Sequence, residues 1–164
     1  MSFDSVGVVR AARPDDAEAA ATVLRRSITE LCQADHQGDA ETLARWLSNK
    51  TPEQVRDWIA DPDRVLVVAE DNGTIHGVAA VQTSGRISLN YVSPDARFRG
   101  VSKALLTDLE RQAKALCLDA CVLESTRTAL AFYRRMGYTE AGNPERSFGV
   151  VIGFPMRKSL GAGA

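Results

Sequence analysis

Residues 92–106, which read VSPDARFRGVSKALL, restrict the fold of this chain more than any other stretch. A strand pattern ends at Pro94, a basic loop containing Gly100 follows, and an amphipathic helix begins directly after it. The first N–H groups of a helix have no intrahelical partners and lie at the positive end of its dipole, so such a loop forms an anion site. The stretch therefore predicts a strand, a phosphate-binding loop and a helix that packs back on the sheet.

Three strand patterns lead directly into this stretch. They occupy residues 64–70, 75–83 and 86–92, and turn signals at residues 71–74 and at Ser84-Gly85 connect them. Because short turns connect antiparallel neighbours, these strands are expected to form the centre of an antiparallel sheet. Another strand, at residues 6–12, is expected near the start of the chain and ends at Arg13-Pro14.

Apolar residues at helical spacing predict helices on both sides of these strands. Before the strands, helices are expected from Asp15 or its neighbour to Cys32, through residues 43–47 and from Pro52 to residue 60, with a loop at residues 33–39. After the glycine loop, the expected elements are a helix from Val101 to Leu116, a strand at residues 120–123, a helix at residues 126–136, and a hairpin of residues 138–141 and 150–156.

This order of elements predicts an α+β fold, with a central mixed, mostly antiparallel sheet flanked by helices in a single three-layer domain. The crossover at residues 92–126 should be right-handed and should join parallel strands. A chain of 164 residues with 45% hydrophobic composition is large enough for one core and small for two. The expected domain is residues 1–160, followed by a disordered tail at residues 161–164.

Charge and cysteine content exclude several classes of function. The formal net charge is −1 and the pI is about 6.1, so the bulk electrostatics predict no nucleic-acid or anionic membrane partner. Three cysteines without paired spacing argue against a disulfide framework. No apolar run approaches the roughly 18 residues of a membrane span, and residues 1–13 do not read as a signal peptide. We therefore expect a soluble, cytoplasmic protein.

Two motifs resemble those of one enzyme family. The run Arg97-Phe98-Arg99-Gly100-Val101-Ser102 is similar to the acyl-CoA-binding signature of the Gcn5-related N-acetyltransferases, (Gln/Arg)-x-x-Gly-x-(Gly/Ala). Residues 129–138, ALAFYRRMGY, resemble the family segment A-x-x-F-Y-x-x-x-G-F/Y. Ser102 replaces the usual second Gly or Ala, and Thr126 stands where Asn is frequent. In element order, the resemblance spans essentially the whole chain.

The resemblance implies acetyl-CoA as co-substrate and a primary amine as acceptor. Backbone N–H groups from Phe98 to Ala104 would hold the pyrophosphate, Gly100 would allow close approach, and the side chain of Lys103 would face solvent. A backbone N–H near Tyr91 or Val92, where the fourth and fifth strands splay, would stabilise the developing oxyanion. The implied cofactor contacts are Tyr91, Val92, Arg97, Phe98, Arg99, Gly100, Val101, Ser102, Lys103, Ala104, Thr126 and Phe132.

The resemblance also assigns Tyr133 as the acid that protonates the departing thiolate. It leaves the base open, because the fourth strand carries no glutamate. Alternatives are a water relay from Asn90 or Ser88, or one of Glu30, His36, Glu70 and Glu124.

A non-catalytic acyl-CoA sensor is the alternative function, and a homodimer is left open. Cys32 and His36 are spaced i, i+4 but do not make a zinc site without further ligands, so no metal is expected.

Overall fold

The computed structural model describes residues 7–147 and 151–161, and its strands form two sheets. The first sheet is antiparallel, in the order β1 (Val8–Ala11), β2 (Arg64–Asp71), β3 (Thr74–Gln82) and β4 (Ile87–Val92). The second has the order β5 (Ala120–Ser125), β8 (Val151–Ser159) and β6 (Thr139–Glu140), and β7 (Glu145–Ser147) also pairs with β8. The hairpins predicted at residues 64–92 are confirmed.

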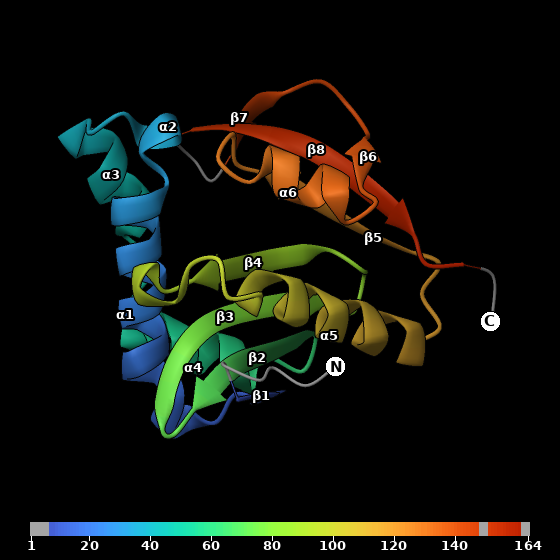
Figure 1. Cartoon of the computed structure of the whole chain (residues 1–164), viewed down its shortest axis with the longest axis horizontal. Helices are drawn as coiled ribbons and strands as arrows, with labels where there is room; N and C mark the ends of the chain where they lie inside the picture. Colours follow the sequence, from blue (N-terminus) through green and yellow to red (C-terminus); the bar gives the residue numbers. More distant parts are fainter. Residues whose placement is uncertain (1–6, 148–150, 162–164) are drawn as a thin grey trace.

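The two sheets meet where β4 runs beside β5. A parallel bridge joins Arg86 to Val122, and the N–H of Val122 donates to the carbonyl of Gly85 at 3.0 Å. Beyond this bridge the strands separate, and the sheets open like a V (Figure 1). The parallel crossover and the splay are confirmed, and the expected mixed sheet is divided in two at that point.

Helices cover both faces of the first sheet (Figure 1). Along β2, Leu66 and Val68 pack in a core with α1 (Ala17–Leu31), whereas Val67 and Ala69 pack in a core with α5 (Val101–Ala115). This alternation is the period-two pattern of a strand buried on both faces. The remaining helical elements are η1 (Pro14–Asp16), α2 (Gln33–His36), α3 (Ala40–Leu47), α4 (Pro52–Ala60), η2 (Pro94–Ala96) and α6 (Leu130–Arg135).

Two sequence predictions of local structure were wrong. The expected loop at residues 33–39 contains α2, because His36 is buried and both of its ring nitrogens are bonded. Its Nε2 lies 3.1 Å from the carbonyl of Ile28, and Nδ1 accepts the N–H of Gly38 at 3.0 Å. The helix expected from residue 126 begins only at Leu130, because Thr126 opens a turn in which its hydroxyl accepts the N–H of Ala129 at 3.1 Å.

Other predictions differ in detail or fall outside the described residues. Leu116, which was expected on the buried face of α5, is 45% exposed because the helix ends at Ala115. The return strand of the last hairpin begins at Val151 and continues to Ser159. Residue 150 and most of the predicted tail, residues 162–164, lie outside the part of the chain that the structure describes.

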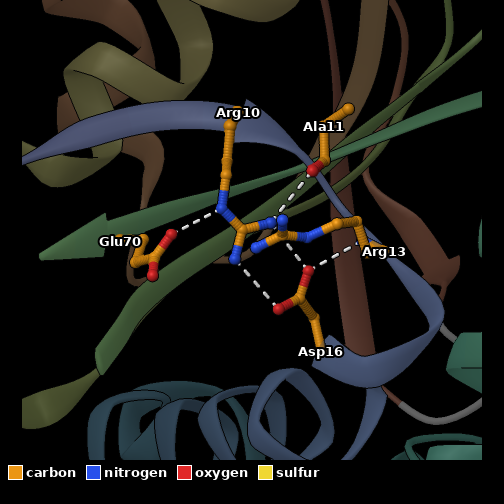
Figure 2. A network of polar contacts seen from close by, with 5 residues as sticks. All are labelled: Arg10, Ala11, Arg13, Asp16 and Glu70. Carbon is orange, nitrogen blue, oxygen red and sulfur yellow. Dashed lines mark hydrogen bonds and ion pairs between the residues drawn. The ribbon is translucent and has the colours of Figure 1, made fainter. Parts of the chain in front are cut away.

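A polar network ties the first strand to the first helix (Figure 2). The guanidinium of Arg10 donates to both carboxylate oxygens of Asp16, at 2.8 and 3.0 Å, and to Glu70 on the neighbouring strand. Asp16 also accepts the N–H of Arg13 at 2.7 Å. Hydrogen bonding from Arg10 lowers the pKa of Asp16 below its ordinary value. The network fixes the start of α1 against β1 and β2.

Candidate active site

A cleft of about 400 Å³ opens where the two sheets separate. Its walls come from β4, β5, the start of α5, α6 and the end of α1. Tyr133 and every cofactor contact expected from the sequence line the cleft, except Arg99 and Ala104. Of the candidates for the base, Ser88, Asn90 and Glu124 line the cleft. The lining residues that were not among the expected site residues are Ser27, Leu31, Cys32, Ile87, Leu89, Ala96, Leu123, Thr128, Ala129, Ala131 and Arg135.

The glycine loop has the backbone conformation of an anion-binding loop. Gly100 caps α5 with φ of 80°, and Phe98 also has a positive φ, of 62°. A Cβ added to Gly100 would meet no protein atom within 4 Å, so the space beside this residue is open to a ligand. Left-handed residues turn successive N–H groups toward one side, as phosphate-binding nests do. The loop therefore fits the pyrophosphate group that the resemblance implies.

The basic residues in and directly after this loop differ in whether they line the cleft. Arg97 lines the cleft, and its guanidinium lies 4.6 Å from the centre of the Phe98 ring. That ring is 92% exposed, so it forms a surface at the mouth of the cleft. Lys103 is exposed, as expected, and also lines the cleft edge. Arg99 and Ala104 lie outside the lining, so these two residues contribute no wall to the cleft.

The open edge of β4 distinguishes between the two N–H groups proposed for the oxyanion. The N–H of Ser93 donates to the carbonyl of His76 on β3 at 2.7 Å. N–H groups alternate sides along an edge strand, so Tyr91 faces β3 like Ser93, and Val92 faces the cleft. Val92 is therefore the better placed donor.

Tyr133 is held rigidly in the cleft. Its side chain is 7% exposed and packs edge-on against the rings of Phe132 and Tyr138, at centroid distances of 5.2 and 5.6 Å. Burial raises the pKa of its phenol to about 12, and a hydrogen bond with Asn90 acts in the opposite direction. At neutral pH the phenol therefore carries its proton.

Two polar atoms on β4 also belong to this site. Ser88 Oγ and Asn90 Oδ1 are buried and have no hydrogen-bond partner among the described residues. Both residues line the cleft. Since buried polar groups in proteins are nearly always bonded, these atoms are suited to a bound ligand or water.

The structure shows which of the candidate bases line the cleft. Glu30 pairs with Arg26 at 2.9 Å on the surface of α1, and Glu70 belongs to the Arg10 network. His36 uses both ring nitrogens in structural bonds. None of these three lines the cleft, whereas Glu124 does. The sequence could not make this selection, because it depends on which face of each element meets the cleft.

A clamp that sequence reasoning missed connects α2 to the turn between β5 and α6. Asp35 accepts the N–H of Arg127 at 2.6 Å and the hydroxyl of Thr128 at 2.6 Å. Thr126 and Thr128 of this turn line the cleft. No local pattern could reveal the clamp, because its partners are more than ninety residues apart in the sequence.

No group of three or more metal-ligating side chains occurs among the described residues, so Cys32 and His36 lack further ligands there. Burial, followed by the charge of Asp35, raises the pKa of the Cys32 thiol to about 12. In the described part of the chain, no helix is long and apolar enough to cross a membrane.

Comparisons with known proteins identify the family. Residues 32–160 match the model of the acetyltransferase (GNAT) domain. An IAA acetyltransferase of Azospirillum brasilense is 30% identical over 115 residues, which cover 62% of this chain and 75% of that protein. A GCN5-related N-acetyltransferase of Rhodopseudomonas palustris has a TM-score of 0.83 at 23% identity, covering 94% of this chain and 96% of that one.

A further solved structure, the PaiA N-acetyltransferase of Thermoplasma acidophilum, was determined in complex with coenzyme A. It has a TM-score of 0.78 at 19% identity, covering 93% of this chain and 98% of that one. The chain belongs to the GNAT acetyltransferase family. It is accordingly a GNAT-type, acetyl-CoA-dependent N-acetyltransferase, and the expected fold and enzyme class are confirmed.

Proposed function

We propose that this chain transfers the acetyl group of acetyl-CoA directly to a primary amine of a small molecule or peptide. One observation carries the proposal. The glycine loop, the free edge of β4 and the buried phenol of Tyr133 all line a single cleft at the point where the sheets separate. A cleft open between two strands gives a thioester and an amine room to approach each other.

Each group has a distinct role in this proposal. The N–H groups at the start of α5 hold the pyrophosphate, and Arg97 adds positive charge at the mouth. The extended edge of β4 binds the pantetheine arm as a neighbouring strand would. The N–H of Val92 donates to the carbonyl oxygen as negative charge develops on it. When bound, acetyl-CoA supplies an acyl group activated by a thiolate leaving group.

Tyr133 assists the departure of the thiolate by donating a hydrogen bond to sulfur. Complete proton transfer from a phenol of pKa about 12 to a thiolate of ordinary pKa about 8.5 would cost roughly 5 kcal/mol. A hydrogen bond stabilises the developing negative charge on sulfur without that cost. This refines the role expected from the sequence, in which Tyr133 transfers its proton outright.

Release of free thiol from acetyl-CoA, measured with a panel of amines, polyamines, amino acids and peptides, tests the proposal. In Tyr133→Phe, we expect kcat to fall roughly 10²- to 10³-fold, as when one transition-state donor is removed. The dissociation constant of acetyl-CoA should change little. Tyr138→Phe is the matched control, because that phenol donates to Glu110 outside the cleft lining. An unchanged kcat in Tyr133→Phe would remove this residue from the mechanism.

The same measurements separate the enzyme from the alternative, an acyl-CoA sensor. A sensor would bind acetyl-CoA and release no thiol with any acceptor. We also propose a cytoplasmic location, since Cys32, Cys117 and Cys121 are all free thiols, as is usual in reducing compartments. The proposal includes no nucleic-acid or membrane partner, and a homodimer would be detected as a doubled mass in solution.

A further inference from the structure

Glu124 is the sole carboxylate among the residues that line the described cleft. Its side chain is 20% exposed, so it is largely screened from bulk water. The basic side chains in the lining are those of Arg97, Lys103 and Arg135. Arg97 lies in the glycine loop and Lys103 in the first turn of α5, where a phosphate would bind. The negative charge of Glu124 therefore lies on a different wall, supplied by β5.

The register of the two strands places Glu124 near the base of the V. The parallel bridge joins Arg86 to Val122, so Ser88 and Glu124 each follow the bridge by two residues. Ser88 is an extra residue in the pairing of β4 with β3, between the pairs Val81–Ile87 and Ala80–Leu89. Asn90, whose interaction with the phenol of Tyr133 lowers the pKa of that phenol, is one side-chain repeat, or roughly 7 Å, beyond Ser88 on β4. A carboxylate and a phenol thus line the same cleft.

The pairing of Glu124 leaves it able to bind a ligand. Arg86 Nη2 lies 3.5 Å from Glu124 Oε2, which is longer than the 2.7–2.9 Å of a charge-assisted hydrogen bond. The side chain of Arg86 is also 48% exposed, and it does not line the cleft. Ser88 Oγ, which is buried without a partner among the described residues, is available in the same cleft to a water molecule or a ligand.

We propose that Glu124 binds the ammonium group of the acceptor and accepts its proton during acetyl transfer. This inference rests on the proposed function of the cleft. The ammonium first gives one proton to the carboxylate, which releases it to solvent, because only the neutral amine has a lone pair for attack. As the bond between nitrogen and the acetyl carbon forms, a second proton on nitrogen passes to the carboxylate, directly or through one water at Ser88. The electron pair of the broken carbon–sulfur bond goes to sulfur, which accepts the hydrogen bond of Tyr133. Glu124 then returns the proton to solvent.

The location of Glu124 also defines the class of acceptor. A basic primary amine brings a positive charge that the carboxylate attracts, whereas an amine that is neutral at pH 7 gains nothing from it. Arg86, directly before β4, is the charged group that faces Glu124. The preferred acceptor is therefore an alkylamine or a lysine-like amine, and the dependence on Glu124 should grow with the basicity of the amine.

Glu124→Gln tests this assignment, with 1,4-diaminobutane and hydroxylamine as probes. Hydroxylamine is largely neutral at pH 7, whereas the diamine is cationic, and uncatalysed rates are subtracted for both. For the diamine, kcat/KM should fall about 100-fold at pH 7, the lower range for loss of a general base. The deficit should shrink as pH rises toward the pKa of the amine, and it should be small for hydroxylamine. Acetyl-CoA binding should be unchanged.

Two controls distinguish catalysis from structure. Arg86→Gln breaks the same ion pair but keeps the carboxylate, so it should retain most of the activity. Glu140→Gln removes an exposed carboxylate, paired with Arg134, that does not line the cleft. Equal losses in Arg86→Gln and Glu124→Gln, or the same loss with both amines at every pH, would overturn the assignment. If the natural chain acetylated neither probe nor any amine of the panel, the proposed function would itself fail.

Discussion

Gly77 on β3 determines how closely α5 approaches the sheet. A Cβ at this position would lie 2.7 Å from Leu105 Cδ1, 2.7 Å from Val101 Cγ1 and 3.3 Å from the carbonyl oxygen of Tyr91. Carbon atoms in good contact are about 3.5–4.0 Å apart, so Gly77→Ala requires a movement of about 1 Å. Val101 is 1% exposed and β-branched, and Leu105 is fully buried, so side-chain rotation offers little relief. The first turn of α5 must therefore shift.

This shift should affect both stability and cofactor binding. Overpacking of this kind costs about 1–3 kcal/mol, which corresponds to a loss of roughly 3–10 °C in Tm for a domain of this size. Val101 is the first residue of α5, directly after the glycine loop. A displacement of about 1 Å moves its N–H groups out of hydrogen-bonding range of a phosphate. We expect the dissociation constant of acetyl-CoA to rise at least about tenfold.

Differential scanning calorimetry and titration calorimetry with acetyl-CoA measure the two effects. Gly142→Ala is the matched control, because an added Cβ there meets only Pro155 side-chain atoms at an ordinary 3.6 Å. It should change neither quantity appreciably. If Gly77→Ala melted and bound acetyl-CoA like the natural chain, the close packing of α5 on β3 would not position the loop, and the argument would be refuted.

The remaining predictions concern two buried charges. Asp16→Asn should destabilise the chain by about 2–3 kcal/mol at pH 7, since it leaves Arg10 without its main partner. The native pKa of Asp16 lies below its ordinary value, so the stabilisation is complete above about pH 4 and lost in more acidic solution, where the denaturation curves of the two proteins should converge. Burial lowers the pKa of Lys50 to about 8, so Lys50→Met should stabilise the chain by about 2 kcal/mol at pH 7. The free energy of unfolding of the natural chain should rise between about pH 8 and 10.5. Urea denaturation should therefore show that the higher stability of Lys50→Met disappears over that range. A stability difference that stayed constant with pH would contradict this account.

Local patterns were sufficient to predict most elements of the fold. The helix start at Pro52, where the hydroxyl of Thr51 accepts the N–H of Gln54, and the hairpin at residues 71–74 were both predicted from a few adjacent residues. Predictions failed where a distant contact outweighed local composition. The polar residues 33–36 became helical because His36 is buried against the carbonyl of Ile28. Hydropathy alone could not indicate that burial.

The residues of the candidate site also fall into two groups, those that the local sequence predicted and those that only the tertiary structure revealed. The anion site at Gly100 could be predicted from the sequence alone, because turn chemistry and helix starts are encoded by neighbouring residues. The role of Tyr133 came from the resemblance to the family motif, and the structure selected Val92 over Tyr91. The choice of Glu124 over Glu30 and Glu70 required the three-dimensional structure, since only tertiary packing determines which carboxylates meet the cleft. The chain thus specifies its phosphate loop locally, whereas the acceptor side of the cleft arises where β4 and β5, more than thirty residues apart in the sequence, come together and then separate.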